Sequence, residues 1–152
     1  MTKRYYFEDL VPGLTFELGS YTVSREEIIE FASEFDPQPF HLDEKAGKAS
    51  ILGGLASSGW HTASITMRLL ALGLLNQSSC QGAPGIEKLQ WRKPVFAGDT
   101  LSARMEVIAA RPLRSRPNLG VVTMRLETRN QHGVPVMTYD NPALFARREV
   151  GG

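Results

Sequence analysis

An acid and a histidine stand five residues apart in the segment Phe35–Asp43, which reads FDPQPFHLD. A carboxylate can accept a proton or orient an imidazole, and histidine titrates close to neutral pH, so Asp36 and His41 have the side chains that proton transfer needs. The prolines at positions 37 and 39 keep the backbone between them out of a regular helix. We therefore predict a stiff, non-helical loop that presents an acid–base pair. The alternative is that Asp36 ends a helix in a turn and that His41 is an ordinary loop histidine.

The spacing of these two residues does not by itself bring their side chains together. A straight polyproline II segment from residue 36 to residue 41 would separate its ends by roughly 15 Å. The loop must therefore turn if both groups are to face one substrate.

A second candidate feature is the glycine-rich segment GGLASSGWHT, residues 53–62, which leads into a long apolar run. Glycine lets the backbone approach a ligand closely, and the first N–H groups of a helix have no intrahelical acceptor. N–H groups near Gly59 could therefore hold the oxyanion that develops on a thioester carbonyl. The simpler interpretation is a tight loop capped at Ser57 or Ser58, with His61 as a packed histidine of the first helical turn.

Composition and charge exclude several classes of protein. The 152 residues include 17 basic and 16 acidic side chains, a formal net charge of +1, so neither nucleic acid nor a membrane surface is expected as a partner. Cys80 is the one cysteine, which excludes an internal disulfide and a multi-cysteine metal site. The first residues, MTKRYYFEDL, lack the apolar run of a signal peptide, and the apolar residues 60–75 are interrupted by Arg68. We expect one cytoplasmic domain over residues 1–152, without a metal.

Three helices are expected in the first half of the chain. Residues 24–35 predict a helix whose apolar side chains form one stripe, with Ser24 and Glu27 as a capping box. Residues 44–50 predict a short helix. Residues 60–77 predict a long helix that is apolar nearly all round, and we therefore expect other elements to wrap it.

From residue 86 onward the apolar period changes from that of a helix to two residues. Strands are predicted at residues 14–23 (as one strand or a bent hairpin), 88–92, 101–107, 122–127 and 134–145. Alternation of apolar and polar side chains predicts an antiparallel meander with one buried face. The fold class is therefore α+β, with the sheet curled round the apolar helix.

The segments FASEFDPQPFHLDEKAGKAS, GGLASSGWHTASITMRLL and LQWRKPVFAGDTL together resemble the MaoC-like dehydratase family, which includes the R-specific enoyl-CoA hydratases. The most specific part is an acid followed by a proline and a histidine, at the spacing found from Asp36 to His41. The resemblance implies the hot-dog fold, in which a curved antiparallel sheet wraps a long central helix. It also implies a homodimer or a higher oligomer.

The same resemblance implies a hydro-lyase of fatty acid metabolism that adds water to, or removes it from, a thioester-linked acyl chain. Asp36 and His41 would be the catalytic acid–base pair, and the N–H near Gly59 would polarise the thioester carbonyl. Coenzyme A or acyl carrier protein would be part of the substrate, so no separate cofactor is expected. Gln38 stands where the family often has Asn, and Ser58 where it often has His, which alters the pocket. The candidate substrate-binding residues are Gln38, Ser58, Gly59, Trp60 and His61.

Two other functions stay open. An acyl-CoA thioesterase of this fold often carries an acid on the central helix, but residues 60–75 contain no carboxylate. A non-catalytic module that binds acyl-CoA or a partner protein would fit the changes at Gln38 and Ser58. Trp60 and Trp91 are most simply core or interface aromatics. The arginines of RPLRSRP, residues 111–117, either contact the phosphates of coenzyme A or belong to a solvated loop, and we expect the loop.

Overall fold

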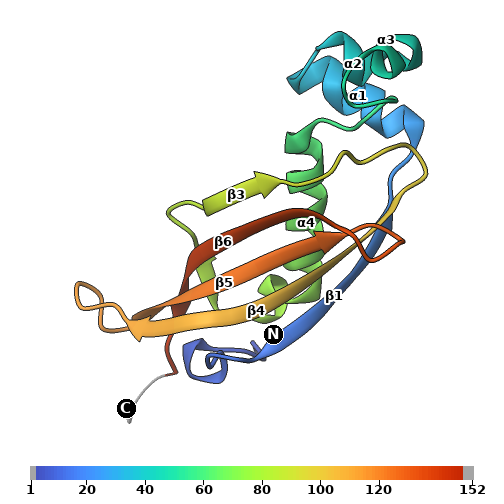
Figure 1. The fold of residues 1–152 in the computed structure, drawn as a ribbon. Helices are drawn as coiled ribbons and strands as arrows, with labels where there is room; N and C mark the ends of the chain where they lie inside the picture. The colour runs from blue at the N-terminus through green and yellow to red at the C-terminus, as the bar shows by residue number, and fades with distance from the viewer. Residues whose placement is uncertain (1–2, 149–152) are drawn as a thin grey trace.

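The computed structural model describes residues 3–148, which form helices and one antiparallel sheet (Figure 1). The elements are η1 (Phe7–Asp9), β1 (Thr15–Thr22), α1 (Arg25–Phe35), α2 (Pro39–Leu42), α3 (Glu44–Ala49), α4 (Gly59–Gly73), η2 (Leu75–Gln77), β2 (Cys80–Gly82), β3 (Glu87–Trp91), β4 (Thr100–Pro112), β5 (Leu119–Arg129) and β6 (Pro135–Ala146). Here η denotes a 3₁₀ helix.

The strands form a six-stranded sheet in the order β1-β4-β5-β6-β2, and β3 also pairs with β6. The long strands curve along one side of α4, while α1, α2 and α3 gather at the end of the molecule where α4 begins (Figure 1). A long helix wrapped by a curved antiparallel sheet is the hot-dog fold. The predicted fold class and its architecture are confirmed.

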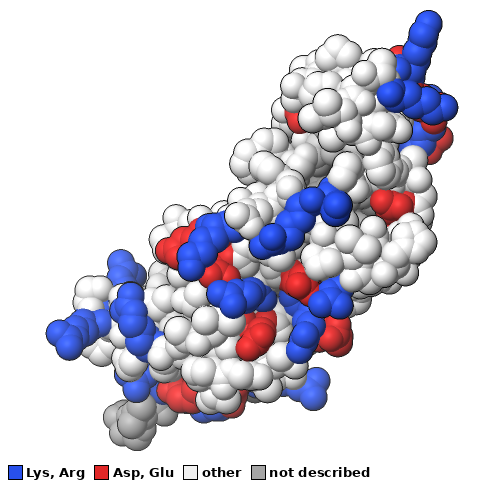
Figure 2. Space-filling view, in the orientation of Figure 1, with Lys and Arg blue, Asp and Glu red and all other residues white. Residues whose placement is uncertain are grey.

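The period-two pattern of the sequence is reflected directly in the core. In β4 the side chains of Leu101, Ala103, Met105 and Val107 are at most 1% exposed, and in β5 those of Val122, Met124 and Leu126 are fully buried. The alternate side chains are polar, and several carry charge, such as Arg125, which forms an ion pair with Asp140 of β6 at 2.9 Å. Figure 2 shows acidic and basic side chains interspersed over this outer face of the sheet. One buried and one solvated face is the arrangement that the alternation predicts.

Helix α4 packs its buried side chains, among them Ile65, Leu69 and Leu70, into the concave face of the sheet. The sheet wraps this helix as predicted, but one side of the helix stays uncovered in the single chain. Trp60 is 57% exposed and Met67 43% exposed, because the sheet curves around only one side. The helix also ends earlier than predicted, at Gly73, before η2. No helix within residues 3–148 is both long and apolar enough to cross a bilayer.

The boundaries of the earlier elements agree with the local sequence signals, with three omissions. The Ser24 hydroxyl accepts a hydrogen bond from the Glu27 N–H at 3.1 Å, so the predicted capping box of α1 is confirmed. The predicted segment 14–23 forms one strand, β1, and not a hairpin, because the register shift between Glu17 and Ser20, where Gly19 has a φ of +97°, bends the strand without reversing it. The short elements η1, α2 and β2 were not predicted.

Two hydroxyl groups join α4 to β5 inside the core. The Oγ1 atoms of Thr66 and Thr128 lie 2.6 Å apart, and Thr66 Oγ1 also lies 3.1 Å from the carbonyl oxygen of Thr62. A carbonyl only accepts, and a hydroxyl has one proton, so Thr66 donates to Thr62 and Thr128 donates to Thr66.

This order of donors predicts unequal effects of two valine substitutions. Thr66→Val leaves the buried Thr128 donor without an acceptor and is expected to lower the free energy of unfolding by roughly 1–3 kcal/mol. Thr128→Val leaves Thr66 bonded to the Thr62 carbonyl and is expected to cost less. Denaturant unfolding of both variants and of the double variant measures the coupling between the two hydroxyls. Equal losses from the two single variants would contradict this order of donors.

Candidate active site

The loop after α1 turns sharply and places His41 in a short helix. Asp36 ends α1 in non-helical backbone, and its N–H donates to the Ala32 carbonyl at 2.9 Å. Pro39 is the first residue of α2, which contains His41. The predicted non-helical backbone is therefore right for Asp36 and wrong for His41. A proline is tolerated at the first position of a helix because its missing N–H would have no intrahelical acceptor there.

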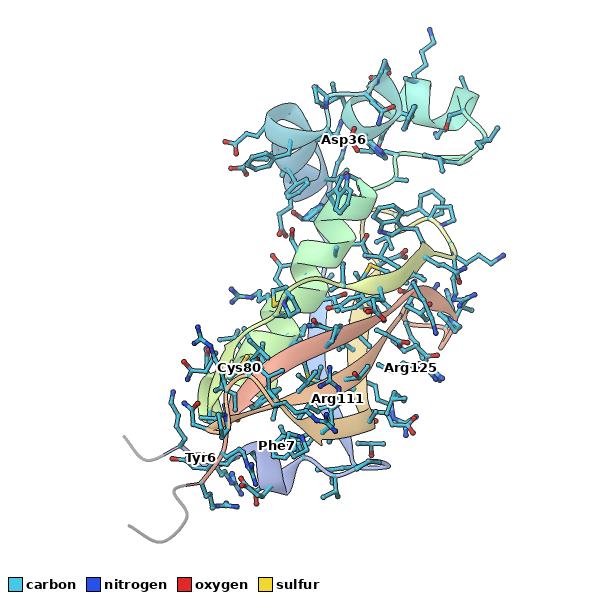
Figure 3. All side chains as sticks on the ribbon, turned by 90° about the vertical axis from the view of Figure 1, so that its left-hand side faces the viewer. Tyr6, Phe7, Asp36, Cys80, Arg111 and Arg125 are labelled. Carbon is cyan, nitrogen blue, oxygen red and sulfur yellow. The ribbon has the colours of Figure 1, made fainter. Side chains whose placement is uncertain are left out.

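This turn brings the acid and the histidine together. His41 Nε2 lies 3.4 Å from Asp36 Oδ2, far less than the separation that a straight segment would give. The His41 side chain is 8% exposed and that of Asp36 is 17% exposed. Asp36 lies beside the start of α4, at the top of the view in Figure 3. The two residues singled out from the sequence therefore form a largely desolvated pair.

A backbone carbonyl determines the tautomer of His41. The Nδ1 atom of His41 lies 2.7 Å from the carbonyl oxygen of Ala56. Because a carbonyl only accepts, Nδ1 carries the proton, and Nε2 of the neutral ring is free to accept one. Nε2 is the atom that faces Asp36, so two proton acceptors converge on one point.

Asp36 is held in its ionised form by its neighbours. Burial alone would raise the pKa of its carboxyl group, but hydrogen bonds from the Gln38 and Ser58 side chains, together with the positive charge that His41 carries when it is protonated, outweigh burial and lower the pKa below 3.8. The amide nitrogen of Gln38 lies 2.5 Å from Asp36 Oδ1. Gln38, a candidate substrate-binding residue, therefore contacts the carboxylate directly. At neutral pH Asp36 is a base.

The start of α4 supplies a free N–H group next to this pair. Ser58 caps the helix, since its hydroxyl accepts from the Trp60 N–H at 3.2 Å and its carbonyl accepts from the His61 N–H at 3.0 Å. Ser57 is not the cap, because its hydroxyl bonds to that of Thr62 at 3.0 Å. In the part of the chain that the structure describes, no acceptor takes the N–H of Gly59. That N–H is available to an anionic oxygen, which the helix dipole also favours.

These groups border one cavity of about 440 Å³. Of the predicted site residues, the structure places Asp36, Gln38, His41, Gly59 and Trp60 around it. Ser58 is fully buried and does not line the cavity. The other lining residues are Phe40, Leu52, Ala56, Ser57, Thr62, Trp91, Arg92, Lys93, Pro94 and Val95. Within residues 3–148 no group of three or more His, Cys, Asp and Glu side chains is placed to hold a metal ion.

His61, like Ser58, is a predicted site residue that does not line this cavity. Its ring stacks on Phe31 of α1 with the centroids 4.7 Å apart, and it borders a separate cavity of about 230 Å³ together with Glu27. The side chain is buried, and its Nδ1 atom has no hydrogen-bond partner among the described residues. Burial lowers the pKa of His61 below 6.5, although the charge of Glu27 partly opposes this effect. This placement agrees with the simpler interpretation of the sequence, in which His61 is a packed histidine of the first helical turn.

The lowered pKa of His61 predicts a loss of stability in mild acid. The unfolded chain protonates this residue near pH 6.5, while the folded protein keeps it neutral to lower pH, so the unfolded state binds more protons in that window. The free energy of unfolding is therefore expected to decrease as the pH falls below about 6.5 and to increase again as the pH rises through this range. Denaturant unfolding at pH 7.5 and pH 5.5 is expected to show a smaller acid-induced loss for His61→Phe than for the wild type. His132→Gln, at an exposed position, is the control. If His61→Phe lost as much stability between pH 7.5 and pH 5.5 as the wild type, His61 would not be the source of the acid-induced loss.

The tertiary structure also places Trp91 and the arginine-rich segment, which the sequence analysis considered as possible parts of the site. Trp91 comes from β3 and reaches the start of α4, a contact that only the pairing of β3 with β6 creates. No local signal in the sequence would have placed it there. The arginine-rich segment lies far from this end, since Arg111 is in the lower half of the view in Figure 3 and Asp36 near the top. In one chain these arginines do not line the cavity, and their side chains are exposed. Arg114 and Arg116 lie in the loop between β4 and β5, as predicted, whereas Arg111 belongs to β4.

Comparison with known proteins identifies relatives over almost the whole chain. The family model of the MaoC like domain matches residues 10–130. The crystal structure of the MaoC-like dehydratase from Rhodospirillum rubrum has a TM-score of 0.90 and 42% identity, and the match covers 97% of this chain and 100% of that one. The 3-hydroxybutyryl-CoA dehydratase of Methylorubrum extorquens is 33% identical over 116 residues, 75% of this chain and 71% of that protein. The uncharacterised protein YdeM of Bacillus subtilis is 31% identical over 141 residues, 92% of this chain and 98% of that protein.

Proposed function

The chain belongs to the MaoC-like domain family, and on that premise we propose that it is a hydro-lyase that adds water to the double bond of an enoyl thioester, or removes it in the reverse direction. The observation that carries the proposal is the approach of His41 Nε2 to the Asp36 carboxylate, 3.4 Å apart, beside a cavity that also borders Gly59. The similarity to a 3-hydroxybutyryl-CoA dehydratase supports the same class of reaction.

The acid–base pair would act on a water molecule that contacts both residues. Ionised Asp36 and the unprotonated Nε2 of His41 are proton acceptors that face each other. As the water oxygen attacks the β-carbon of the enoyl group, the pair takes the proton that the water loses. The pair then returns a proton to the α-carbon, so that one water molecule is added across the double bond. Positioned acid–base groups of this kind contribute roughly 10²–10⁴-fold to a rate.

The start of α4 would stabilise the charge that this attack creates. When the oxygen adds to the β-carbon, the electrons of the double bond move onto the thioester oxygen. The N–H of Gly59, at the positive end of the helix dipole, is a donor for that oxygen. The carbonyl of Ala56, three residues earlier in the chain, holds His41. The base and the oxyanion donor are therefore positioned by the same short segment.

The thiol of the substrate would be coenzyme A or acyl carrier protein, and the proposed steps need no further cofactor. We place the reaction in the fatty acid metabolism of the cytoplasm, where such thioesters are made and consumed. The acyl group would occupy the cavity, whose walls include Phe40, Leu52, Trp60 and Val95 beside the polar residues.

The test is the absorbance of the enoyl-thioester band of crotonyl-CoA, and of a few longer or branched enoyl-CoAs, after addition of the protein. Loss of the band without release of free thiol is expected. Release of free thiol would indicate a thioesterase instead. Binding of acyl-CoA without any turnover would indicate a non-catalytic module.

We also propose that two copies associate through β3 and the exposed side of α4. Within the described residues β3 pairs only with β6, so its other edge is open to another strand. Trp91 in β3 and Ile86 just before it are each more than two-fifths exposed, as are Trp60 and Met67 of α4, and the Trp60 ring contacts that of Trp91. An unpaired edge beside exposed apolar side chains is a surface that a second copy would cover.

A charge placed in this surface is expected to separate the two copies. Met67→Glu would bury an unpaired carboxylate at the interface and should weaken association roughly tenfold or more. Light scattering after gel filtration measures the mass of each species over a range of concentrations. Val11→Glu, at an exposed apolar position of the N-terminal segment, is the control. A wild type that is monomeric at every concentration would rule out this interface.

A further inference from the structure

A side chain from the sheet holds the first residue of α4. The indole Nε1–H of Trp91 donates a hydrogen bond to the carbonyl oxygen of Gly59 at 2.9 Å. Trp91 is the last residue of β3, and its backbone pairs with Met137 of β6. The contact therefore joins the helix start to the sheet across 32 residues of sequence.

The same indole ring also packs against the backbone of Gly59. A Cβ atom at position 59 would lie 2.7 Å from Trp91 Nε1 and closer still to Cε2, so no side chain fits between ring and backbone. The ring of Trp60 meets Trp91 edge-on, with the centroids 5.2 Å apart. Glycine has the widest choice of backbone angles of any residue. At Gly59 a hydrogen bond on the carbonyl and an aromatic ring against the Cα restrict that choice.

We propose that Trp91 is a positioning residue that fixes the direction of the Gly59 N–H, the oxyanion donor. The inference rests on the hydratase function proposed above. The N–H and the carbonyl of Gly59 are attached to the same Cα. Because Trp91 holds both the carbonyl and the Cα, it limits the backbone rotation at Gly59 that would turn the N–H away from the substrate. Donors that are fixed before the reaction stabilise a developing charge without the cost of reorganisation.

Trp91→Phe tests this role because it keeps an aromatic ring at the position and removes the N–H. We expect kcat for crotonyl-CoA to fall about tenfold with KM changed less than threefold. This loss is smaller than the 10²–10³-fold typical for removal of an oxyanion donor itself, since the Gly59 N–H is still present. Gln90→Ala is the control, because Gln90 is exposed and its side chain leaves β3 on the opposite face from that of Trp91. Thermal unfolding of each variant establishes that it is folded.

A spectroscopic measurement separates this role from simple packing against the substrate. A dienoyl-CoA that binds without turnover absorbs at longer wavelength when its carbonyl is polarised. The wild type and Gln90→Ala are expected to shift the band of 2,4-hexadienoyl-CoA to longer wavelength, and Trp91→Phe is expected to shift it less at saturation.

Two results would overturn the inference alone: a wild-type kcat and band shift in Trp91→Phe, or a raised KM with an unchanged kcat and band shift. The second would mean that Trp91 contacts the substrate without orienting Gly59. A wild type that neither hydrates crotonyl-CoA nor shifts the dienoyl band would overturn the proposed function, and the role of Trp91 with it.

Discussion

Replacing Asp36 by Asn is expected to lower the turnover number for crotonyl-CoA hydration by roughly 10²–10⁴-fold while the protein remains folded. Asparagine has the same shape and keeps the hydrogen bond with Gln38 within reach, but its amide cannot take a proton from water. The wild-type carboxylate is ionised throughout the neutral range, because hydrogen bonds from Gln38 and Ser58 lower its pKa against the effect of burial. The whole of its basicity is therefore lost in the variant.

Steady-state kinetics and thermal unfolding of Asp36→Asn distinguish a chemical defect from a structural one. Asp43→Asn is the matched control, since Asp43 is exposed and caps α3 through a bond to the Ala46 N–H, a role that asparagine also fills. It should keep the wild-type rate within a few-fold. Wild-type turnover in Asp36→Asn would remove Asp36 from the mechanism and leave His41 as the base.

The largest effect on stability is expected for Gly47→Ala, which should lower the free energy of unfolding by about 3 kcal/mol. Gly47 lies in α3, where a Cβ atom would be 2.7 Å from the Leu55 nitrogen and closer still to the Gly54 carbonyl oxygen. Both neighbours are backbone atoms, so the clash is relieved only if α3 moves away from the segment that leads to α4. A loss of this size lowers the melting temperature of a protein of this length by roughly 6–12 °C.

Activity should fall as well, because the displaced segment includes Ala56, whose carbonyl holds His41. Gly85→Ala is the control: it places a methyl group where no other heavy atom lies within 4 Å, and the backbone there is not in the left-handed region. Calorimetry of both variants, with the crotonyl-CoA assay at a temperature where both are folded, gives the two effects separately. Equal melting temperatures for Gly47→Ala and Gly85→Ala would show that α3 has room to adjust.

Much of the fold could be predicted because its signals are local. The capping box of Ser24 and Glu27 needs only a four-residue segment, and the buried faces of β4 and β5 follow from the alternation of side chains along an extended chain. Asp36 and His41 could be recognised in the same way, as a short motif with fixed spacing. The types of neighbouring side chains and their spacing were therefore enough to predict these helices and strands and to single out Asp36 and His41.

Which residues at the start of the long helix face the cavity could not be predicted, because this depends on how the helix is rotated about its own axis. Trp60 and His61 are neighbours in the sequence, but successive residues of a helix point about 100° apart. The structure directs Trp60 to the cavity and His61 to Phe31 on α1. Either assignment is compatible with the apolar pattern of residues 60–77, which shows no polar face.

By itself, then, the sequence determined an α+β chain with a long apolar helix, a meander with one buried face, and an acid and a histidine of fitting chemistry. The tertiary structure decided the 3.4 Å approach of His41 to Asp36, through a turn into the unpredicted helix α2. It also decided the contact of Trp91 with Gly59, which joins residues 32 positions apart. The physical reason is that periodicity and capping act within one or two helical turns, whereas these distances depend on how the helices pack against the sheet.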